Sequence, residues 1–351
     1  GFMTRGISRK RALQIVKRMR GRRLAVVGDW MLDRYVWGTA NRISPEAAVP
    51  VVDFVEQSEC LGGAGNVAAN LAALGARVEI FGAIGKDEAG AGMRRCLREM
   101  RLRDNGILEV AGRPTTLKTR IIARHQQVVR VDREVRTHLP EGAEEQLVKR
   151  IVAALIGLNA LVISDYDKGV VSDTLAEKVL GACTKRKIPS FVKPKWSRLP
   201  AYRGATLVIC NRAEAGFLVA HALDTEESVA DAGRKLLEHF NCAAVVITLG
   251  AQGLRLFERE DPSGFHVAAI NQEMQIVIGK RPGAKSGRQV FDVTGAGDTV
   301  LATMALASAS GATLREAAVL GNAAAGVVVA KLGTATLTRE ELTAMLSEAA
   351  T

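Results

Sequence analysis

Aromatic side chains, regularly spaced cysteines and long apolar runs are all scarce in this chain of 351 residues. Aromatic residues make up only 4% of it, which disfavours a surface on which nucleic-acid bases would stack. The five cysteines are odd in number and far apart, without metal-ligand spacing, so we expect free thiols in a reducing cytoplasm. No run of 18 apolar residues and no secretory signal occur, so neither a membrane span nor export is expected.

Acidic residues are missing from one end of the chain. Residues 1–23 contain nine of the 48 Lys and Arg residues and no acid, so the rest carries 39 basic against 37 acidic residues. The net charge of +11 therefore lies mostly in this segment, whereas a nucleic-acid binder shows a basic face on its folded body. We interpret residues 1–23 as a solvated, partly helical basic extension. A non-catalytic binder of nucleic acid or of an anionic membrane surface is the alternative.

Short apolar runs alternate with amphipathic stretches along most of the chain. This βαβ pattern predicts an α/β fold, in which a mostly parallel central sheet is covered by helices on both faces. Strands are predicted at 24–27, 77–81, 161–164, 188–192, 207–210 and 245–249, and helices at 67–74, 88–100, 172–185, 227–239, 298–308, 314–330 and 339–349.

Two stretches interrupt this alternation. Residues 35–56 and 113–132, approximately, are rich in β-branched side chains and contain no predicted helix. We expect them to form a small inserted β-sheet, a lid over the carboxyl ends of the parallel strands, where open α/β folds bind ligands. The predicted organisation is thus an extension at 1–23 and a single domain at 24–351 that carries the lid.

A glycine-rich motif precedes the helix predicted at 298–308. Gly295, Ala296 and Gly297 leave backbone N–H groups uncovered at the helix N-terminus, which suits an anion such as a transferring phosphoryl group. Asp298 follows in the first turn, where its carboxylate can accept a proton from an attacking hydroxyl. The alternative is an aspartate that only stabilises the helix N-terminus.

A second glycine-rich motif lies at 62–68, with the sequence Gly-Gly-Ala-Gly-Asn-Val-Ala. Gly62 and Gly63 let a ligand approach the backbone, and Asn66 can cap the next helix or bind a polyol hydroxyl. The run also fits a dinucleotide fingerprint loosely, but the acid that ribose recognition needs is missing after the next strand. An NAD-dependent oxidoreductase and a purely structural tight turn are the alternatives.

The two motifs resemble those of the ribokinase-like, or PfkB, family of carbohydrate kinases, over roughly residues 24–345. The element at 292–298, Asp-Val-Thr-Gly-Ala-Gly-Asp, is highly specific for that family, and the run at 62–68 supports it. The runs at 28–38, 42–51, 164–169 and 331–336 are similar to the branch of D-glycero-β-D-manno-heptose-7-phosphate kinases. Members of this branch are often fused to a nucleotidyltransferase domain, and the end of the chain at 351 leads us to expect the stand-alone form.

This resemblance implies a ribokinase-like three-layer fold and a cytoplasmic, ATP-dependent kinase. The enzyme would phosphorylate the anomeric hydroxyl of D-glycero-D-manno-heptose 7-phosphate, giving heptose 1,7-bisphosphate for the lipopolysaccharide inner core. Asp298 would be the base, and the amides of residues 295–297 would stabilise negative charge together with Mg²⁺. Another PfkB kinase, acting on fructose 1-phosphate, ribose or a nucleoside, is the alternative. No nucleic-acid or membrane partner is expected, and pairing through the lid predicts a homodimer.

Candidate ligand-binding residues follow from the chemistry and from the resemblance. Short carboxylates and an amide suit a polyol, and cations suit its phosphate. The expected sugar-phosphate ligands are Asp29, Asp33, Gly62, Gly63, Asn66 and Asp165, with Lys118, Arg120, Arg124 and Arg130 for the phosphate. The resemblance implies ATP ligands at Asn211, Arg212, Ala213, Glu214, Thr248, Gly250, Gly253 and Asn322, with Glu214 holding Mg²⁺ through water and Asp292 near a monovalent cation such as K⁺.

Each of these residues also has a structural interpretation. Asn211 can be a helix cap, residues 248–253 a plain hairpin turn, and Asn322 a helix-surface residue. Asp33 or Asp165 can be a turn residue, and the cations can lie on a solvated lid edge.

The sequence departs from the family pattern at the end of a central strand. Where relatives read Asp-Pro-Lys, this chain has Lys193, Pro194 and Lys195. A cation thus replaces an anion near the expected site, which can either help to bind phosphate or impair the site.

Overall fold

The computed structural model of the chain describes residues 6–124, 126–195, 202–269, 295–329, 331 and 336–348. Asp292 and residues 332–335 of the last run similar to the heptose kinases lie outside the described residues.

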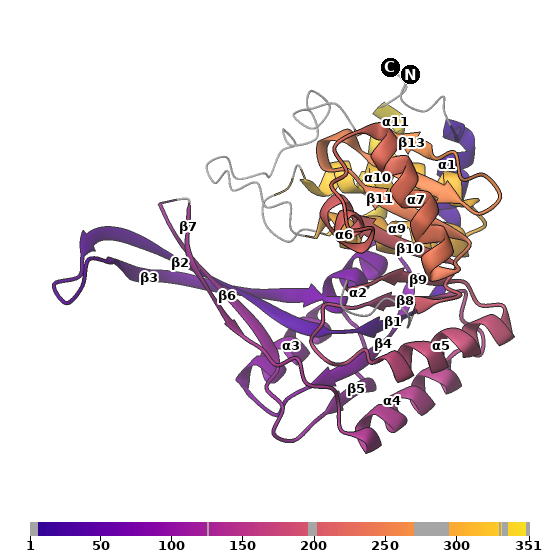
Figure 1. The fold of residues 1–351 in the computed structure, drawn as a ribbon. Coiled ribbons are helices and arrows are strands. Elements are labelled where there is room, and N and C mark those ends of the chain that lie inside the picture. The colour runs from indigo at the N-terminus through magenta and orange to yellow at the C-terminus, as the bar shows by residue number, and fades with distance from the viewer. Residues whose placement is uncertain are drawn as a thin grey trace.

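A nine-stranded sheet forms the centre of the described structure (Figure 1). Its strands from β11 to β5 run parallel, while β12 pairs antiparallel with β11 and β13 pairs antiparallel with β12 at one edge. In spatial order the strands are β13 (Phe265–Val267), β12 (Leu254–Glu258), β11 (Ala244–Thr248), β10 (Leu207–Asn211), β9 (Ser190–Lys193), β8 (Ala160–Ser164), β1 (Arg23–Gly28), β4 (Arg77–Ile84) and β5 (Gly106–Glu109).

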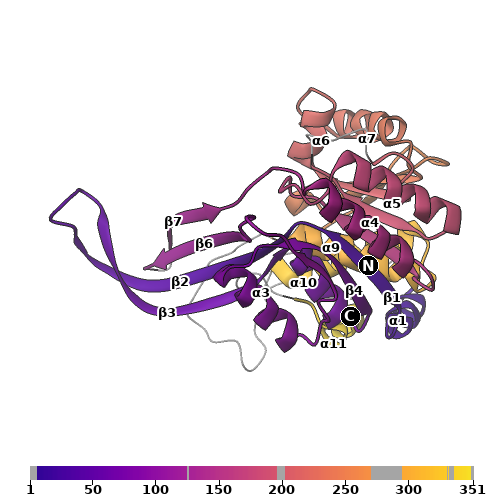
Figure 2. The ribbon, with the colours of Figure 1, turned by 90° about the horizontal axis from the view of Figure 1, so that it is seen from below.

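Helices cover both faces of this sheet (Figure 2). Side chains alternate along each strand, so Leu24 and Val26 of β1 enter one core while Ala25 and Val27 enter the other. The first core is covered by α1 (Arg9–Arg18), α2 (Ala64–Ala73), α3 (Glu88–Glu99), α9 (Ala296–Ala309), α10 (Leu314–Val329) and α11 (Arg339–Glu348). The second is covered by α4 (Glu141–Ala154), α5 (Asp173–Arg186), α6 (Arg212–Leu218) and α7 (Glu226–Phe240). The predicted three-layer α/β architecture is confirmed.

A second sheet of four strands projects from the body as a long arm (Figure 1). We call it the lid sheet, and its order is β3 (Pro50–Gly63), β2 (Trp30–Ile43), β6 (Thr116–Ala123) and β7 (Gln126–Arg133). Both predicted lid segments belong to it, but β2 and β3 are longer than predicted and extend into the body. Their inner ends carry buried side chains such as Met31 and Leu61. The lid sheet is thus continuous with the main core.

None of the helices in the described ranges is both long and apolar enough to cross a membrane.

The basic segment at the N-terminus forms α1, and only one face of it is solvated. Ile15 and Val16 are buried in the first core, and Met19 just after the helix is buried as well. Arg11 pairs with Glu316 of α10 at 2.9 Å between Nε and Oε1. The predicted helix is present. The prediction that this segment is solvated is wrong for one face, because apolar residues at helical spacing pack α1 onto the domain.

We predict that Ile15→Ala lowers the free energy of unfolding by about 2–5 kcal/mol, because it leaves a cavity in the core. Urea unfolding followed by circular dichroism would measure the change. Gln14→Ala, on the exposed face of the same helix, serves as the control and is expected to change stability by less than about 0.5 kcal/mol. Equal stability of the two variants would show that α1 does not contribute to the fold.

Candidate active site

Asp298 lies in the first turn of α9 with its side chain only 4% exposed. The helix begins at Ala296, and its N-cap Gly295 has φ 96°, a backbone conformation that favours glycine. The first N–H groups of an α-helix have no partner within the helix. This turn therefore presents backbone amides next to a buried carboxylate.

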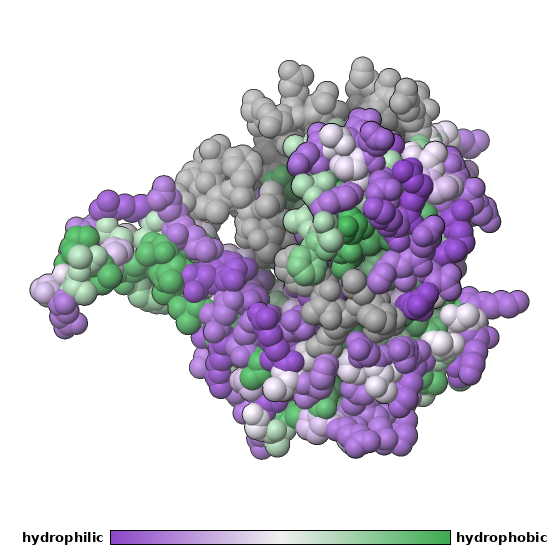
Figure 3. Space-filling model, viewed as in Figure 1, coloured by the Kyte–Doolittle hydropathy of each residue, from purple (hydrophilic) through white to green (hydrophobic). Residues whose placement is uncertain are grey.

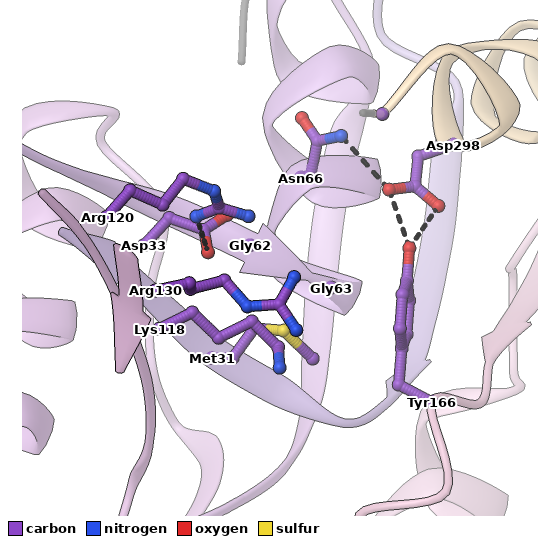
Figure 4. Close-up of a pocket in the computed structure, with 11 residues that line it drawn as sticks. Met31, Asp33, Gly62, Gly63, Asn66, Lys118, Arg120, Arg130, Tyr166 and Asp298 are labelled. Carbon is purple, nitrogen blue, oxygen red and sulfur yellow. Dashed lines mark hydrogen bonds and ion pairs between the residues drawn. The ribbon is translucent and has the colours of Figure 1, made fainter. Parts of the chain in front are cut away.

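Three side chains from distant parts of the sequence donate hydrogen bonds to the Asp298 carboxylate (Figure 4 shows two of them). Asn66 Nδ2 lies 3.0 Å from Oδ2, and Lys193 Nζ lies 2.8 Å from Oδ1. The Tyr166 hydroxyl donates to both oxygens, at 2.8 and 2.9 Å. The carboxylate makes no capping bond to its own helix, so this geometry favours a functional carboxylate over a residue that only stabilises the helix end.

Both Tyr166 and Lys193 stay protonated beside the charge of Asp298. The pKa of the Tyr166 phenol is raised well above its ordinary value, first by burial and then by the neighbouring carboxylate. Burial lowers the pKa of Lys193, but the charge of Asp298 outweighs this effect, and the net pKa lies above its ordinary value. At neutral pH the carboxylate therefore faces one cation and one O–H donor.

A cavity of about 200 Å³ opens between Asp298 and the lid sheet (Figure 4). The side chains of Asn66 and Tyr166 line it on the Asp298 side. The rest of the lining is Met31, Asp33, Gly62, Gly63, Lys118, Arg120, Arg130 and Gly295.

Three cations of the lid sheet line this cavity, and each has an acidic partner. Arg120 pairs with the buried Asp33 at 2.8 Å between Nη1 and Oδ1. Lys118 Nζ lies 3.0 Å from Asp132, to which Arg130 donates two hydrogen bonds of 2.9 and 3.0 Å. A cluster of cations at one end of a polar cavity suits a phosphate group.

Arg124, the fourth predicted cation, is not brought to this cavity. It lies exposed in the turn between β6 and β7, where Nη2 is 3.5 Å from Asn41 Oδ1.

Asp29, predicted as a sugar ligand, lies beneath the cavity lining. Its carboxylate is buried and accepts hydrogen bonds from the backbone N–H groups of Tyr166 (2.8 Å), Lys168 (3.1 Å) and Val170 (3.1 Å). The residue therefore holds in place the loop that carries Tyr166.

Asp165 also differs from its predicted role, whereas Asn66 lies in the cavity lining. Asp165 is buried away from the cavity lining and accepts hydrogen bonds from the Tyr202 hydroxyl and from the Asp167 N–H. Asn66 lies inside α2, whose N-cap is Gly63, so the capping alternative is wrong. Its amide lines the cavity and orients Asp298 instead.

The predicted nucleotide residues gather at the carboxyl ends of β10 and β11. Asn211 and Glu214 form a reciprocal capping box on α6, with both bonds at 2.8 Å, so the cap interpretation of Asn211 is confirmed. Glu214 Oε1 accepts no hydrogen bond within the described ranges. Arg212, which precedes Ala213 on α6, donates a hydrogen bond to Gln252 and so links the two predicted nucleotide segments.

The glycines after β11 form a tight turn. Thr248 ends the strand, a 3₁₀ turn covers Gly250–Gln252, and β12 then returns antiparallel, so the hairpin interpretation is confirmed. Gly253 has φ 89°, and a Cβ there would lie 2.0 Å from the Val267 carbonyl oxygen, so no other residue fits. Asn322 is buried and donates to the Ala268 carbonyl at 2.8 Å, so it is not a helix-surface residue.

Among the residues that the structure describes, no group of three or more His, Cys, Asp or Glu is arranged to hold a metal ion.

Sequence reasoning left Tyr166 and Lys193 out of the site. Tyr166 lies in the run at 164–169 that resembles the heptose kinases, and Lys193 was noted only as a departure from the family pattern. Both contact Asp298 because β8 and β9 are neighbours and end at the same edge of the sheet.

Comparisons with known proteins agree with this geometry. Residues 22–341 match the profile of the pfkB family of carbohydrate kinases. The chain is 42% identical over 321 residues to "Bifunctional protein HldE" of Geobacter sulfurreducens, covering 92% of this chain and 62% of that protein. It is 41% identical over 331 residues to the HldE protein of Paramagnetospirillum magneticum, covering 94% and 64%. The chain thus spans about three fifths of the length of these curated relatives.

Solved structures share the fold at lower sequence identity. Phosphofructokinase-2 of Escherichia coli, in complex with substrates and products, aligns with a TM-score of 0.73 at 21% identity, covering 94% of this chain and all of that one. Ribokinase of Arabidopsis thaliana, complexed with ribose and ATP, aligns with a TM-score of 0.69 at 20% identity, covering 93% and 99%. The ribokinase-like fold is confirmed.

We predict that Asp29→Asn lowers the free energy of unfolding by about 1–3 kcal/mol, because the amide nitrogen cannot accept the backbone N–H groups that the carboxylate accepts. Urea unfolding would measure the loss. Asp224→Asn, at an exposed position, is the matched control and should be neutral. If both variants unfold at the same urea concentration, Asp29 does not hold the Tyr166 loop.

Proposed function

Because the chain belongs to the pfkB family of carbohydrate kinases, we propose that it phosphorylates the anomeric hydroxyl of D-glycero-D-manno-heptose 7-phosphate at the expense of ATP. The product would be heptose 1,7-bisphosphate, a precursor of the lipopolysaccharide inner core made in the cytoplasm. One observation carries the proposal: a buried carboxylate at a helix N-terminus faces a cavity whose far side holds three cations.

The chemistry follows from the surroundings of Asp298. Its carboxylate accepts the proton of the anomeric hydroxyl, whose oxygen forms the new bond to the γ-phosphorus as the bond to the β-phosphate oxygen breaks. The amides of Gly295, Ala296 and Gly297 stabilise the negative charge of the transferring group. Hydrogen bonds from Asn66 and Tyr166 fix the carboxylate before the substrates arrive, so little reorganisation is needed during the reaction.

The nucleotide would lie along the carboxyl ends of β10 and β11. Outside its own turn, no described atom lies within 4 Å of the point where a Cβ on Gly250 would stand, which leaves room for a ligand, and Asn322 holds the backbone of Ala268. Glu214 has a carboxylate oxygen that accepts no hydrogen bond in the described structure, which fits a water-mediated contact to Mg²⁺. The ion supplies neutralisation of the phosphate charges when it is bound.

The sugar phosphate would fill the cavity under the lid sheet. Lys118, Arg120 and Arg130 would share its 7-phosphate, and the carboxylate of Asp33 would orient hydroxyl groups. The identity of about 40% to HldE proteins favours a heptose phosphate over fructose 1-phosphate, ribose or a nucleoside. Membership of a kinase family also replaces the oxidoreductase and binding-protein interpretations of the sequence.

We predict that an ADP-release assay across a panel of sugars gives the highest kcat/KM with heptose 7-phosphate. A substrate that leaves the lid cations without a phosphate is expected to react on the order of 10²-fold more slowly, because buried polar groups then remain unpaired. Fructose 1-phosphate and ribose are the comparison substrates. Turnover of fructose 1-phosphate with none of the heptose phosphate would overturn the proposed substrate.

Asp298→Asn provides the control for this assay. It should lower turnover on the order of 10²–10⁴-fold, as expected for loss of a general base, while ATP still binds. Asp173→Asn, at an exposed position on α5, is the matched variant and should leave turnover unchanged. Near-normal turnover of Asp298→Asn would exclude this carboxylate as the base.

Exposed apolar side chains on the lid sheet support a homodimer, which we propose forms through this sheet. Hydrophobic residues gather on the projecting arm (Figure 3). Phe54 is 66% exposed and Ile43 is 65% exposed, although large apolar side chains are usually buried. Val49, Val55, Val128, Val129 and Val131 extend this exposed apolar surface.

We predict that the protein sediments with twice the mass of one chain and that Phe54→Asp produces the monomer, because a buried unpaired charge opposes association. Sedimentation equilibrium would measure both masses. Ile156→Asp is the control, because Ile156 is 74% exposed but lies away from the lid sheet. A monomeric wild-type protein at high concentration would contradict the proposal.

A further inference from the structure

We infer that Lys193 exchanges ion-pair partners during the reaction, leaving Asp298 for the γ-phosphate of ATP. Nucleotide binding would then neutralise the phosphate and make the base available in a single event. The inference rests on the proposed kinase function and assigns to Lys193 a catalytic role.

The Lys193–Asp298 pair is shielded from water. Nζ and Oδ1 are 2.8 Å apart, and the two side chains are 18% and 4% exposed. An ion pair in such surroundings interacts more strongly than a surface pair. Because the pair neutralises the carboxylate that must accept a proton, it opposes the reaction as long as it persists.

The ammonium group also lies beside the amides that would receive the transferring phosphate. A Cβ built on Gly297 would lie 3.6 Å from Lys193 Nζ, with Cε of the same lysine the next nearest atom at 3.9 Å. Among the residues that the structure describes, and apart from its own helix, Lys193 is therefore the nearest neighbour of this glycine. An anion bound by the amides of the first turn would meet the ammonium there.

Both partners keep favourable contacts after the exchange. Lys193 Nζ lies 3.1 Å from the Tyr166 hydroxyl and 4.9 Å from the centre of its ring, so the tyrosine can hold the cation away from Asp298. Asp298 retains its hydrogen bonds from Asn66 and Tyr166. The lysine stem is flexible, which allows a small movement of the ammonium without a change in the backbone.

After the exchange, Asp298 is the group that accepts the proton of the sugar hydroxyl. When the ammonium leaves Oδ1, that oxygen can accept the proton of the sugar hydroxyl. Lys193 stays protonated throughout, in agreement with its raised pKa, and neither donates nor accepts a proton. Its positive charge stabilises the negative charge on the phosphoryl group while the bond to ADP breaks.

The inference is tested by comparing ATP with ADP, since only ATP has the γ-phosphate. Isothermal titration calorimetry without sugar would measure both affinities. Lys193→Met is expected to weaken ATP binding on the order of tenfold and to leave ADP binding within about twofold, as for loss of one hydrogen bond between charged groups. Turnover should fall on the order of 10²-fold.

A second pair of variants keeps the test valid if Lys193→Met folds poorly with an unpaired buried carboxylate. Asp298→Asn releases the lysine and should bind ATP several-fold more tightly than the wild-type protein. Adding Lys193→Met to Asp298→Asn removes both charges and should lose on the order of tenfold in ATP affinity relative to Asp298→Asn alone. Lys178→Met, on the exposed face of α5, is the matched control and should change nothing.

The outcomes separate this inference from the proposed function. An unchanged ratio of ATP to ADP affinity in both lysine variants, or a rise in turnover of Lys193→Met, would refute the partner exchange while leaving the kinase assignment intact. A wild-type protein that binds no ATP and phosphorylates no sugar would refute both.

Discussion

The structure around the cavity depends on one buried negative charge. A carboxylate that is 4% exposed needs partners, because an unpaired charge away from water is costly. The partners of Asp298 come from α2, from the loop after β8 and from the end of β9, and each is positioned by packing against the central sheet. The hydrogen bonds that satisfy the charge therefore also set the position of the first turn of α9, and with it the backbone amides at that helix end.

Asp29 joins the central sheet to the lid sheet and also contacts the surroundings of this charge. Asp29 is the only residue between β1 of the central sheet and β2 of the lid sheet. Its carboxylate accepts the backbone N–H groups of the loop that carries Tyr166. A movement of the lid sheet at this junction would therefore shift the loop of Tyr166, whose hydroxyl is bonded to Asp298. Asp29 thus lies at the lid junction and contacts the loop whose tyrosine is bonded to the proposed base.

Much of the fold could be predicted because the local signals agree with it. The apolar runs became strands, and the helix predicted at 172–185 begins where Ser172 caps α5, its hydroxyl accepting the Leu175 N–H at 2.9 Å. The docking of α1 could not be predicted from its charge. Its few apolar residues are buried only because α10 and α11 lie in the same core, and the sequence of α1 does not contain that information. The contact between Lys193 and Asp298 joins residues 105 positions apart, and its geometry depends on strand order, which local patterns do not contain. Asp29 and Arg124 were recognised as charged candidates, but the direction of each side chain follows from tertiary structure.

The packing of α1 has a consequence for the order of assembly in the cell. Ile15 shares a hydrophobic core with Leu342 and Met345 of α11, so the first and last helices of the described chain lie in contact. During translation α1 is synthesised more than 300 residues before α11. Its apolar face therefore lacks its contact with α11 during that time. This layer can therefore be completed only after α11 has been synthesised, because α1 has no α11 surface to pack against before that point.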